Sequence, residues 1–228
     1  MVTMIDSETD LRNDLITQLA SAFAEHLVSV TLFGSAAGDA RRAVSDTNVV
    51  IVLTTVDPAR LERARSAIAL IRVALRLRLM ILREDELPAA TRAFTVKIAD
   101  ILRRRKVLYG RDVFAGLEIP RDAAIAQVRQ SLLHLTLRLR ESWLDGWDAA
   151  RTCAEVAGGL RACAAQVLAL EGTPANSARE ALNILAGGPL DDLSAAREGT
   201  LTGPAAGVLR LRLLDTCALM RQRAEALG

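Results

Sequence analysis

VSVTLFGSAAGDARRAVSDTNVVIVL, residues Val28–Leu53, is the stretch that decides the fold of this chain. Its two apolar runs, 28–33 and 49–53, are short and rich in β-branched residues, which is typical of buried strands. Between them lie the pair Gly34–Ser35 and a small, basic, turn-forming segment that ends in Asp46-Thr47-Asn48. A glycine turn after one strand, with a carboxylate at the start of the next, can hold phosphate and a divalent metal ion.

Outward from this stretch, helical and extended patterns alternate. Apolar residues recur at helical spacing over 6–26 and again over 58–71. The run 73–82 alternates apolar with polar residues, which predicts a third strand. A further helix over 94–106 and the short run VLYG, 107–110, complete a predicted small α/β domain.

The segment 110–121, GRDVFAGLEIPR, is the best candidate for a domain boundary because it contains two glycines and a proline. Beyond it only helical patterns occur, separated by Gly/Pro breaks: 123–144, 149–170, 177–185 and 204–227. We therefore predict an α/β domain over residues 1–115, followed by an all-α helical bundle over residues 116–228.

Composition limits the classes of partner. Apolar residues make up 51% of the 228 residues but aromatic residues only 3%, so the core must be aliphatic. Such Ala- and Leu-rich composition favours helices. The net charge of +2, from 29 basic and 27 acidic residues, is too balanced for a general nucleic-acid binder. We expect no nucleic-acid partner.

The cysteines and histidines argue against a thiolate or imidazole metal site. Cys153, Cys163 and Cys217 are odd in number and lack metal-ligand spacing, so we expect free thiols in a reducing compartment. The histidines are only two, His26 and His134. The acidic N-terminal segment is unlike a signal peptide, and no apolar run approaches the roughly 20 residues of a membrane span. We expect a cytoplasmic protein with no membrane partner.

Gly34–Ser35, followed by Asp46-x-Asn48 at the head of an apolar strand, resembles the signature of the nucleotidyltransferase superfamily. In its minimal and aminoglycoside nucleotidyltransferase-like members, a Gly-Ser pair precedes Asp-x-Asp by about ten residues. The flanking helix, the third strand, the VLYG run and the appended helices are also similar. The resemblance implies an α+β fold, with a small nucleotidyltransferase-like α/β domain that has a mixed sheet, followed by an all-α helical bundle.

The resemblance also implies roles for residues. Gly34 and Ser35 would hold the triphosphate, and Asp46 and Asn48 occupy the two catalytic carboxylate positions, with Asp46 as a ligand of Mg²⁺. The chain departs from the family at Asn48, which is neutral. Asp46 could equally be a turn residue ahead of a strand.

The third family carboxylate, expected on the strand 73–82, is also missing. That strand has Arg76 and Arg78 at its polar positions. They could bind an anion in the cleft or face solvent on an edge strand. Arg41, in the turn-forming segment, is a further candidate for phosphate contact.

Three functional hypotheses follow. In the first, the chain is a nucleotidyltransferase-like protein with a degraded metal site that binds a nucleoside triphosphate or another anion, with little or no transferase activity. In the second, it is an active Mg²⁺-dependent enzyme that transfers a nucleoside monophosphate to a hydroxyl of a small molecule or protein, with a base from Glu84, Asp85 or the helical domain. In the third, the chain is a structural or regulatory partner protein whose apolar helical bundle mediates homodimer formation or a toxin–antitoxin-type pairing.

One further motif is set aside. Arg129 and His134 have the Arg-x4-His spacing of ribonucleases that accompany minimal nucleotidyltransferases. Residues five apart do not share one ideal helix face, so we interpret the match as coincidence.

Overall fold

The structure is a computed structural model that describes residues 3–37 and 46–228. The chain divides into two compact units. The first holds the residues up to Thr91 together with Asp100–Glu118, and the second holds Arg92–Ala99 together with Ile119–Gly228. The predicted domain limits assign residues 92–99 to the first domain, whereas in the structure they belong to the second unit.

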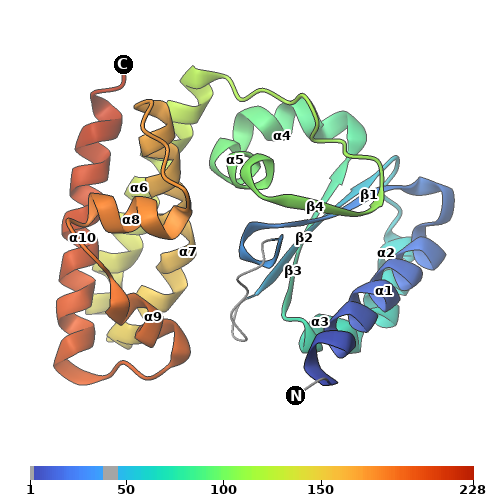
Figure 1. The fold of residues 1–228 in the computed structure, drawn as a ribbon, viewed down its shortest axis with the longest axis horizontal. Helices are drawn as coiled ribbons and strands as arrows, with labels where there is room; N and C mark the ends of the chain where they lie inside the picture. The colour runs from blue at the N-terminus through green and yellow to red at the C-terminus, as the bar shows by residue number, and fades with distance from the viewer. Residues whose placement is uncertain (1–2, 38–45) are drawn as a thin grey trace. The chain divides into compact units, whose positions relative to one another are not determined.

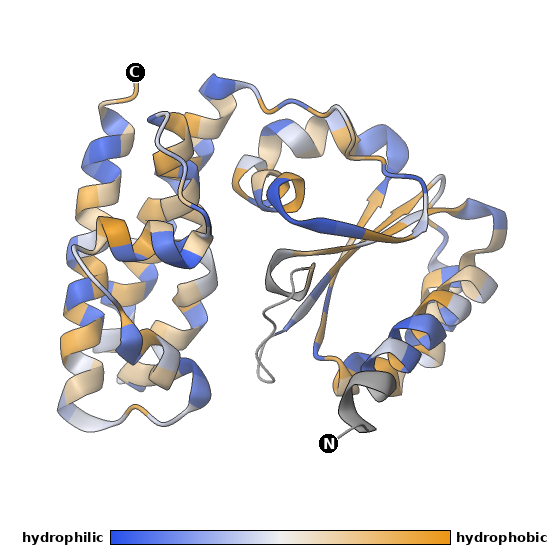
Figure 2. Ribbon diagram, viewed as in Figure 1, coloured by the Kyte–Doolittle hydropathy of each residue, from blue (hydrophilic) through white to orange (hydrophobic). Residues whose placement is uncertain are grey.

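The first unit is built on a four-stranded mixed sheet in the order β3-β2-β1-β4 (Figure 1). The strands are β1 (Leu27–Phe33), β2 (Thr47–Leu53), β3 (Leu77–Arg83) and β4 (Arg105–Gly110). β1 is antiparallel to β2 and β4, and β2 is parallel to β3. The inner strands, LVSVTLF and TNVVIVL, are buried along most of their length, which explains their nearly continuous hydrophobicity (Figure 2).

Helices connect and cover the strands. α1 (Thr3–Phe23) precedes β1, and α2 (Pro58–Ala67) and α3 (Ala69–Ala74) connect β2 to β3. After β3 the chain forms α4 (Leu87–Ala93) and α5 (Thr95–Arg103). One face of the sheet packs on α1 to α3 through an apolar core that includes Leu19, Phe23, Leu32 and Ile51. A parallel β2–β3 pair requires a crossover of this kind, and α2 and α3 supply it.

Two local expectations for this crossover were wrong. The helix predicted over 58–71 is two helices that meet at Ile68. The strand predicted over 73–82 begins only at Leu77, because the preceding residues finish α3. Ile68, Ile71 and Leu75 are buried at helical spacing, and this burial overrides the strand-like alternation that starts at residue 73.

The second unit is an aliphatic helical bundle, as predicted. It contains α6 (Arg121–Leu144), α7 (Ala149–Leu170), α8 (Ala178–Leu185), α9 (Asp191–Glu198) and α10 (Gly203–Glu225). α7 is central and contacts the other four helices. In the described chain it is the one helix long and apolar enough to cross a membrane by length and composition alone, and most of its apolar side belongs to the bundle core.

The three cysteines lie in this bundle as buried free thiols. Burial raises the pKa of Cys163 to about 12 and the pKa values of Cys153 and Cys217 to about 11. Arg129 has a structural contact in the same unit: its guanidinium donates to the carbonyl oxygens of Ala224, Glu225 and Gly228 at the end of α10. These bonds satisfy carbonyls that a helix end leaves without partners.

Candidate functional site

One row of residues crosses the sheet at the end where β1 stops and the other three strands start. Asn48 on β2 lies opposite Arg78 on β3 and opposite Phe33 on β1. Phe33 in turn lies opposite Arg105 on β4. Directly paired residues project from the same face of a sheet, so Asn48 and Arg78 are neighbours on one face.

Gly34 follows this row and begins a 3-10 turn, Gly34–Ala37. Its φ of +73° lies in the left-handed region, which favours glycine. Its amide donates to the carbonyl of Arg104 (3.1 Å), which ties the turn to the end of α5. A Cβ atom at Gly34 would stand 3.4 Å from Oδ2 of Asp100 and 3.5 Å from Nδ2 of Asn48. A carboxylate and an amide therefore face the same point beside the glycine turn.

Asp46 lies just before β2, and a cation holds its carboxylate. Nε of Arg78 donates to Oδ2 of Asp46 at 3.3 Å. The side chains are 44% and 73% exposed respectively, so the pair is open to water. The carboxylate lies directly before β2 and the guanidinium on β3, the neighbouring parallel strand, where the sequence lacks the third carboxylate expected from the resemblance.

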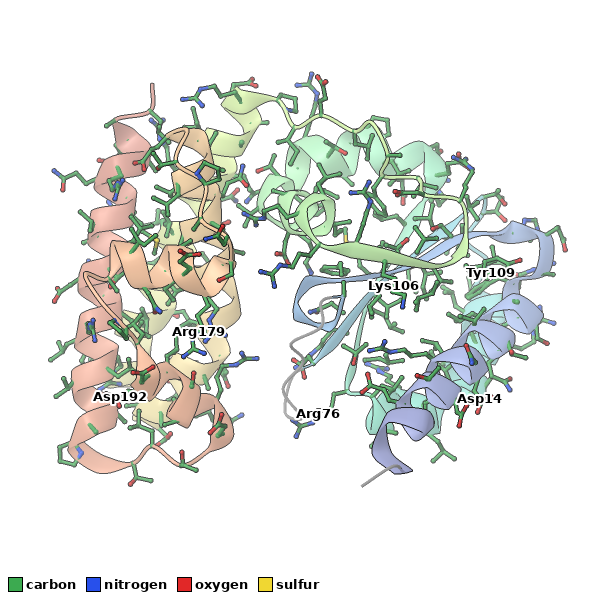
Figure 3. All side chains as sticks on the ribbon, viewed as in Figure 1. Asp14, Arg76, Lys106, Tyr109, Arg179 and Asp192 are labelled. Atoms are coloured by element: carbon green, nitrogen blue, oxygen red, sulfur yellow. The ribbon has the colours of Figure 1, made fainter. Side chains whose placement is uncertain are left out.

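Arg76 also belongs to this end of the sheet (Figure 3). Its carbonyl accepts a hydrogen bond from the amide of Thr47 (3.2 Å), and this bond joins the starts of β2 and β3. Its φ of +49° is unusual for a residue with a side chain. Arg76 occupies the position after α3 where glycine commonly ends a helix.

Asp100 is the site residue that was not identified from the sequence. It lies in α5 and forms an ion pair with Arg103 at 3.7 Å. Its closeness to Gly34 depends on the packing of α5 against the end of β1, which no local pattern reveals. One compositional signal exists: Asp100 is the lone acid between Glu86 and Asp112, in an otherwise basic segment.

Comparisons with known proteins identify the fold. No protein-family model matches the chain, and no curated protein matches it. Among solved structures, the chain is similar to spectinomycin adenyltransferase AAD(9) from Enterococcus faecialis, crystallised with ATP and spectinomycin. The TM-score is 0.64, with 14% sequence identity, over 95% of this chain and 99% of that chain. The fold is nucleotidyltransferase-like.

The predicted fold class is therefore confirmed: a nucleotidyltransferase-like α/β domain with a mixed sheet, followed by an all-α helical region. A structural similarity at 14% identity establishes the fold but not the reaction. The roles of single residues are therefore argued from the geometry of this chain. The row Arg78–Asn48–Phe33, the Gly34 turn and Asp46 lie together at one end of the nucleotidyltransferase-like sheet.

Of the predicted site residues, Ser35 is described only in its backbone and Arg41 is not described. The backbone of Ser35 lies in the turn that Gly34 begins, but its side chain is outside the described residues. Arg41 lies outside the described residues altogether.

Glu84 and Asp85, the candidate catalytic bases of the first domain, lie far from the Asn48 row. Asn48 is in register with Arg78, whereas Leu53 is in register with Arg83, so Glu84 and Asp85 follow the far end of β3. At about 3.3 Å per residue, that end is roughly 17 Å from the Asn48 row. The carboxylate of Glu84 is paired there with Arg111.

The other basic residue of the row, Arg105, forms an ion pair with Asp112. Nε and a terminal nitrogen of Arg105 donate to the carboxylate of Asp112 at 2.9–3.1 Å. These hydrogen bonds hold the pKa of Asp112 below its usual range. Arg78, paired through a single longer contact, is the more available cation.

Proposed function

We propose that this chain binds a nucleoside triphosphate, or another anion of similar charge, at the Gly34 end of its nucleotidyltransferase-like sheet, with little or no nucleotidyl transfer. The observation that carries the proposal is the ion pair between Asp46 and Arg78. It puts a guanidinium beside the one family carboxylate that this sequence keeps. Guanidinium groups bind phosphate oxygens in charge-assisted, often bidentate geometry.

The glycine turn supports the same ligand. The left-handed Gly34 leaves space beside the sheet that a side chain would occupy, between Asn48 and Asp100. Small residues in such turns let a phosphate approach the backbone closely. The similar solved structure is named as an adenyltransferase and holds ATP, which makes a nucleotide a reasonable ligand for the shared fold.

The donor set does not fit a two-metal transfer site. Such sites place several anionic oxygens around two divalent ions. Here the second family position is the neutral Asn48, the carboxylate of Asp46 is shared with a cation, and β3 contributes Arg78. Within residues 3–37 and 46–228, no three His, Cys, Asp or Glu side chains come together as a metal site.

A second function, Mg²⁺-dependent transfer of a nucleoside monophosphate, is favoured by one observation. Asp100 brings a carboxylate to the same point that Asn48 faces. In that reaction an acceptor hydroxyl oxygen would bond to the α-phosphorus, pyrophosphate would leave, and the hydroxyl proton would pass to a base. Asp100 is a carboxylate, among the described residues at this end of the sheet, that could take that proton.

Calorimetry on the full chain tests the proposal. ATP, GTP, CTP and UTP are titrated with excess EDTA and, separately, with Mg²⁺. We expect at least one nucleotide to bind in EDTA, and Arg78→Ala to weaken that binding. Arg63→Ala is the matched control, because Arg63 is an exposed arginine on α2, the helix that covers the other face of the sheet.

Pyrophosphate release, measured with ATP, Mg²⁺ and spectinomycin as the trial acceptor, separates the two functions. Release well above the background without protein, and lost in Asp100→Asn, would replace binding by transfer. No heat with any nucleotide, with or without Mg²⁺, would contradict both.

A further inference from the structure

α6 and α10 form an antiparallel pair with one outer face, and contacts near both ends establish their arrangement. At one end, Arg129 of α6 binds carbonyls at the end of α10, including Ala224. At the other, the guanidinium of Arg210 donates to Oγ of Ser142 (3.1 Å) and stacks on Trp143 at 3.6 Å. The start of each helix therefore lies beside the end of the other.

These contacts identify the row of each helix that faces its neighbour. On α6 the row is Arg129, Thr136 and Trp143, at steps of seven, which is close to two helical turns. Residues one position before this row face α7. The side chain of Leu135, for example, lies against Gly159 of α7, where an added Cβ would be 3.1 Å from its Cδ2. Residues one position after it turn the other way, toward solvent.

The solvent side of α6 carries exposed leucines. Leu137 and Leu144 each follow the α10-facing row by one position, and Leu133 lies one turn before Leu137. Their exposed fractions are 46% for Leu133, 43% for Leu137 and 92% for Leu144. Three leucines along one helix, left in water, form a stripe and not scattered surface residues.

α10 continues this surface. Its α6-facing row is Arg210, Cys217 and Ala224, and Leu209, one position before Arg210, belongs to the core. Leu211, one position after Arg210, is 54% exposed, and the nearby Val208 is 64% exposed.

We infer that the α6–α10 face, defined by Leu133, Leu137, Leu144, Val208 and Leu211, joins two copies of this chain in a homodimer. Its exposed apolar side chains amount to on the order of 500 Å², a large part of the roughly 800 Å² per partner that a standard interface buries. An apolar face of this size is comparable to the largest exposed apolar patch of a typical monomer, and such patches often serve in binding.

The charges on the face favour a second copy over a different partner. Arg140, Glu141 and Asp215 are exposed on these two helices. Among the described residues, none of the three side chains forms an ion pair. A twofold interface brings the same patch from both copies together, so a face with a cation and two acids can pair with itself. A partner of one strong charge would meet repulsion from part of it.

The molar mass of the full chain, measured by light scattering after size exclusion and by analytical ultracentrifugation from about 1 to 100 μM, tests the inference. We expect a dimer in the wild type. Leu137→Glu combined with Leu144→Glu should raise the dimer dissociation constant more than about 100-fold, since the dimer holds two copies of each change. Both positions are exposed, so circular dichroism and the thermal midpoint should stay close to the wild type.

Ile184→Glu is the control, because Ile184 is 53% exposed on α8, outside the α6–α10 pair. It should leave the dimer intact. A wild type that is monomeric up to 100 μM would overturn the inference. So would a double variant that dimerises like the wild type, or a control that dissociates as much as the double variant.

Discussion

Replacing Asp46 with asparagine should strengthen the binding of a nucleoside triphosphate in the absence of Mg²⁺. Asn keeps the shape and one carbonyl oxygen of the side chain but removes its charge. In the structure, that charge holds the guanidinium of Arg78 through a 3.3 Å contact. Without it, Arg78 is free to bind phosphate, and the ligand no longer meets a carboxylate beside it. Removing a metal ligand would have the opposite effect.

The expected magnitude follows from the exposure of the pair. Both side chains are more than one third exposed, so solvent screens their attraction, and such pairs are worth about 0.2–1 kcal/mol. Asp46→Asn should therefore tighten binding by no more than about fivefold. Arg78→Ala removes a charge-assisted contact and should weaken binding about tenfold, or about 1.4 kcal/mol. The double variant should bind about as weakly as Arg78→Ala alone, because Asp46 acts through Arg78.

Anisotropy of a fluorescent ATP analogue in EDTA, at about 50 mM salt, measures these affinities while limiting electrostatic screening. The same titrations with Mg²⁺ serve as the comparison. Weaker binding by Asp46→Asn in EDTA would refute the reasoning. So would binding that appears only with Mg²⁺ and disappears in this variant, since Asp46 would then be a metal ligand.

Four further predictions concern stability and reactivity. Arg76→Gly should stabilise the protein by about 1 kcal/mol in urea unfolding, because the left-handed φ of +49° costs a side chain about that much. Gly110→Ala should cost at least about 3 kcal/mol in the same assay, since its Cβ would lie 2.0 Å from the carbonyl oxygen of Val28 and its φ is +73°. The buried cysteines should resist a thiol reagent at pH 8 until urea unfolds the chain. Because burial raises their pKa values, that of Cys163 to about 12, the native state keeps thiol protons that the unfolded state loses. The free energy of unfolding should therefore fall as pH rises above about 9.

The central part of the fold could be predicted because its signals are local. Two continuous apolar runs around Gly34 indicate inner strands, and the structure has β1 and β2 there. The start of β3 could not be placed from its pattern. The alternation from Val73 onward is compatible with a strand, but the burial of Ile71 and Leu75 continues the helix, and this burial depends on packing against α1.

The candidate site could also be predicted only in part from the sequence. The family signature predicted which residues of β1 and β2 would lie at the end of the sheet. Whether Arg78 faces that site or solvent depends on the parallel register of β3 with β2, which a sequence pattern of period two leaves open. Asp100 could not be placed either, because 66 residues separate it from Gly34 and only tertiary packing brings the two together.

The two ion pairs explain how such a site could accept a polyanion without a metal. Of the carboxylates near Gly34 in the described residues, Asp46 is paired with Arg78 at 3.3 Å and Asp100 with Arg103 at 3.7 Å. Each pair is formally neutral, and both contacts are longer than an ideal charge-assisted hydrogen bond. A triphosphate has more charge than either carboxylate and can compete for both guanidinium groups. The arginines would then exchange an internal partner for the ligand, so divalent ions are not required to balance its charge.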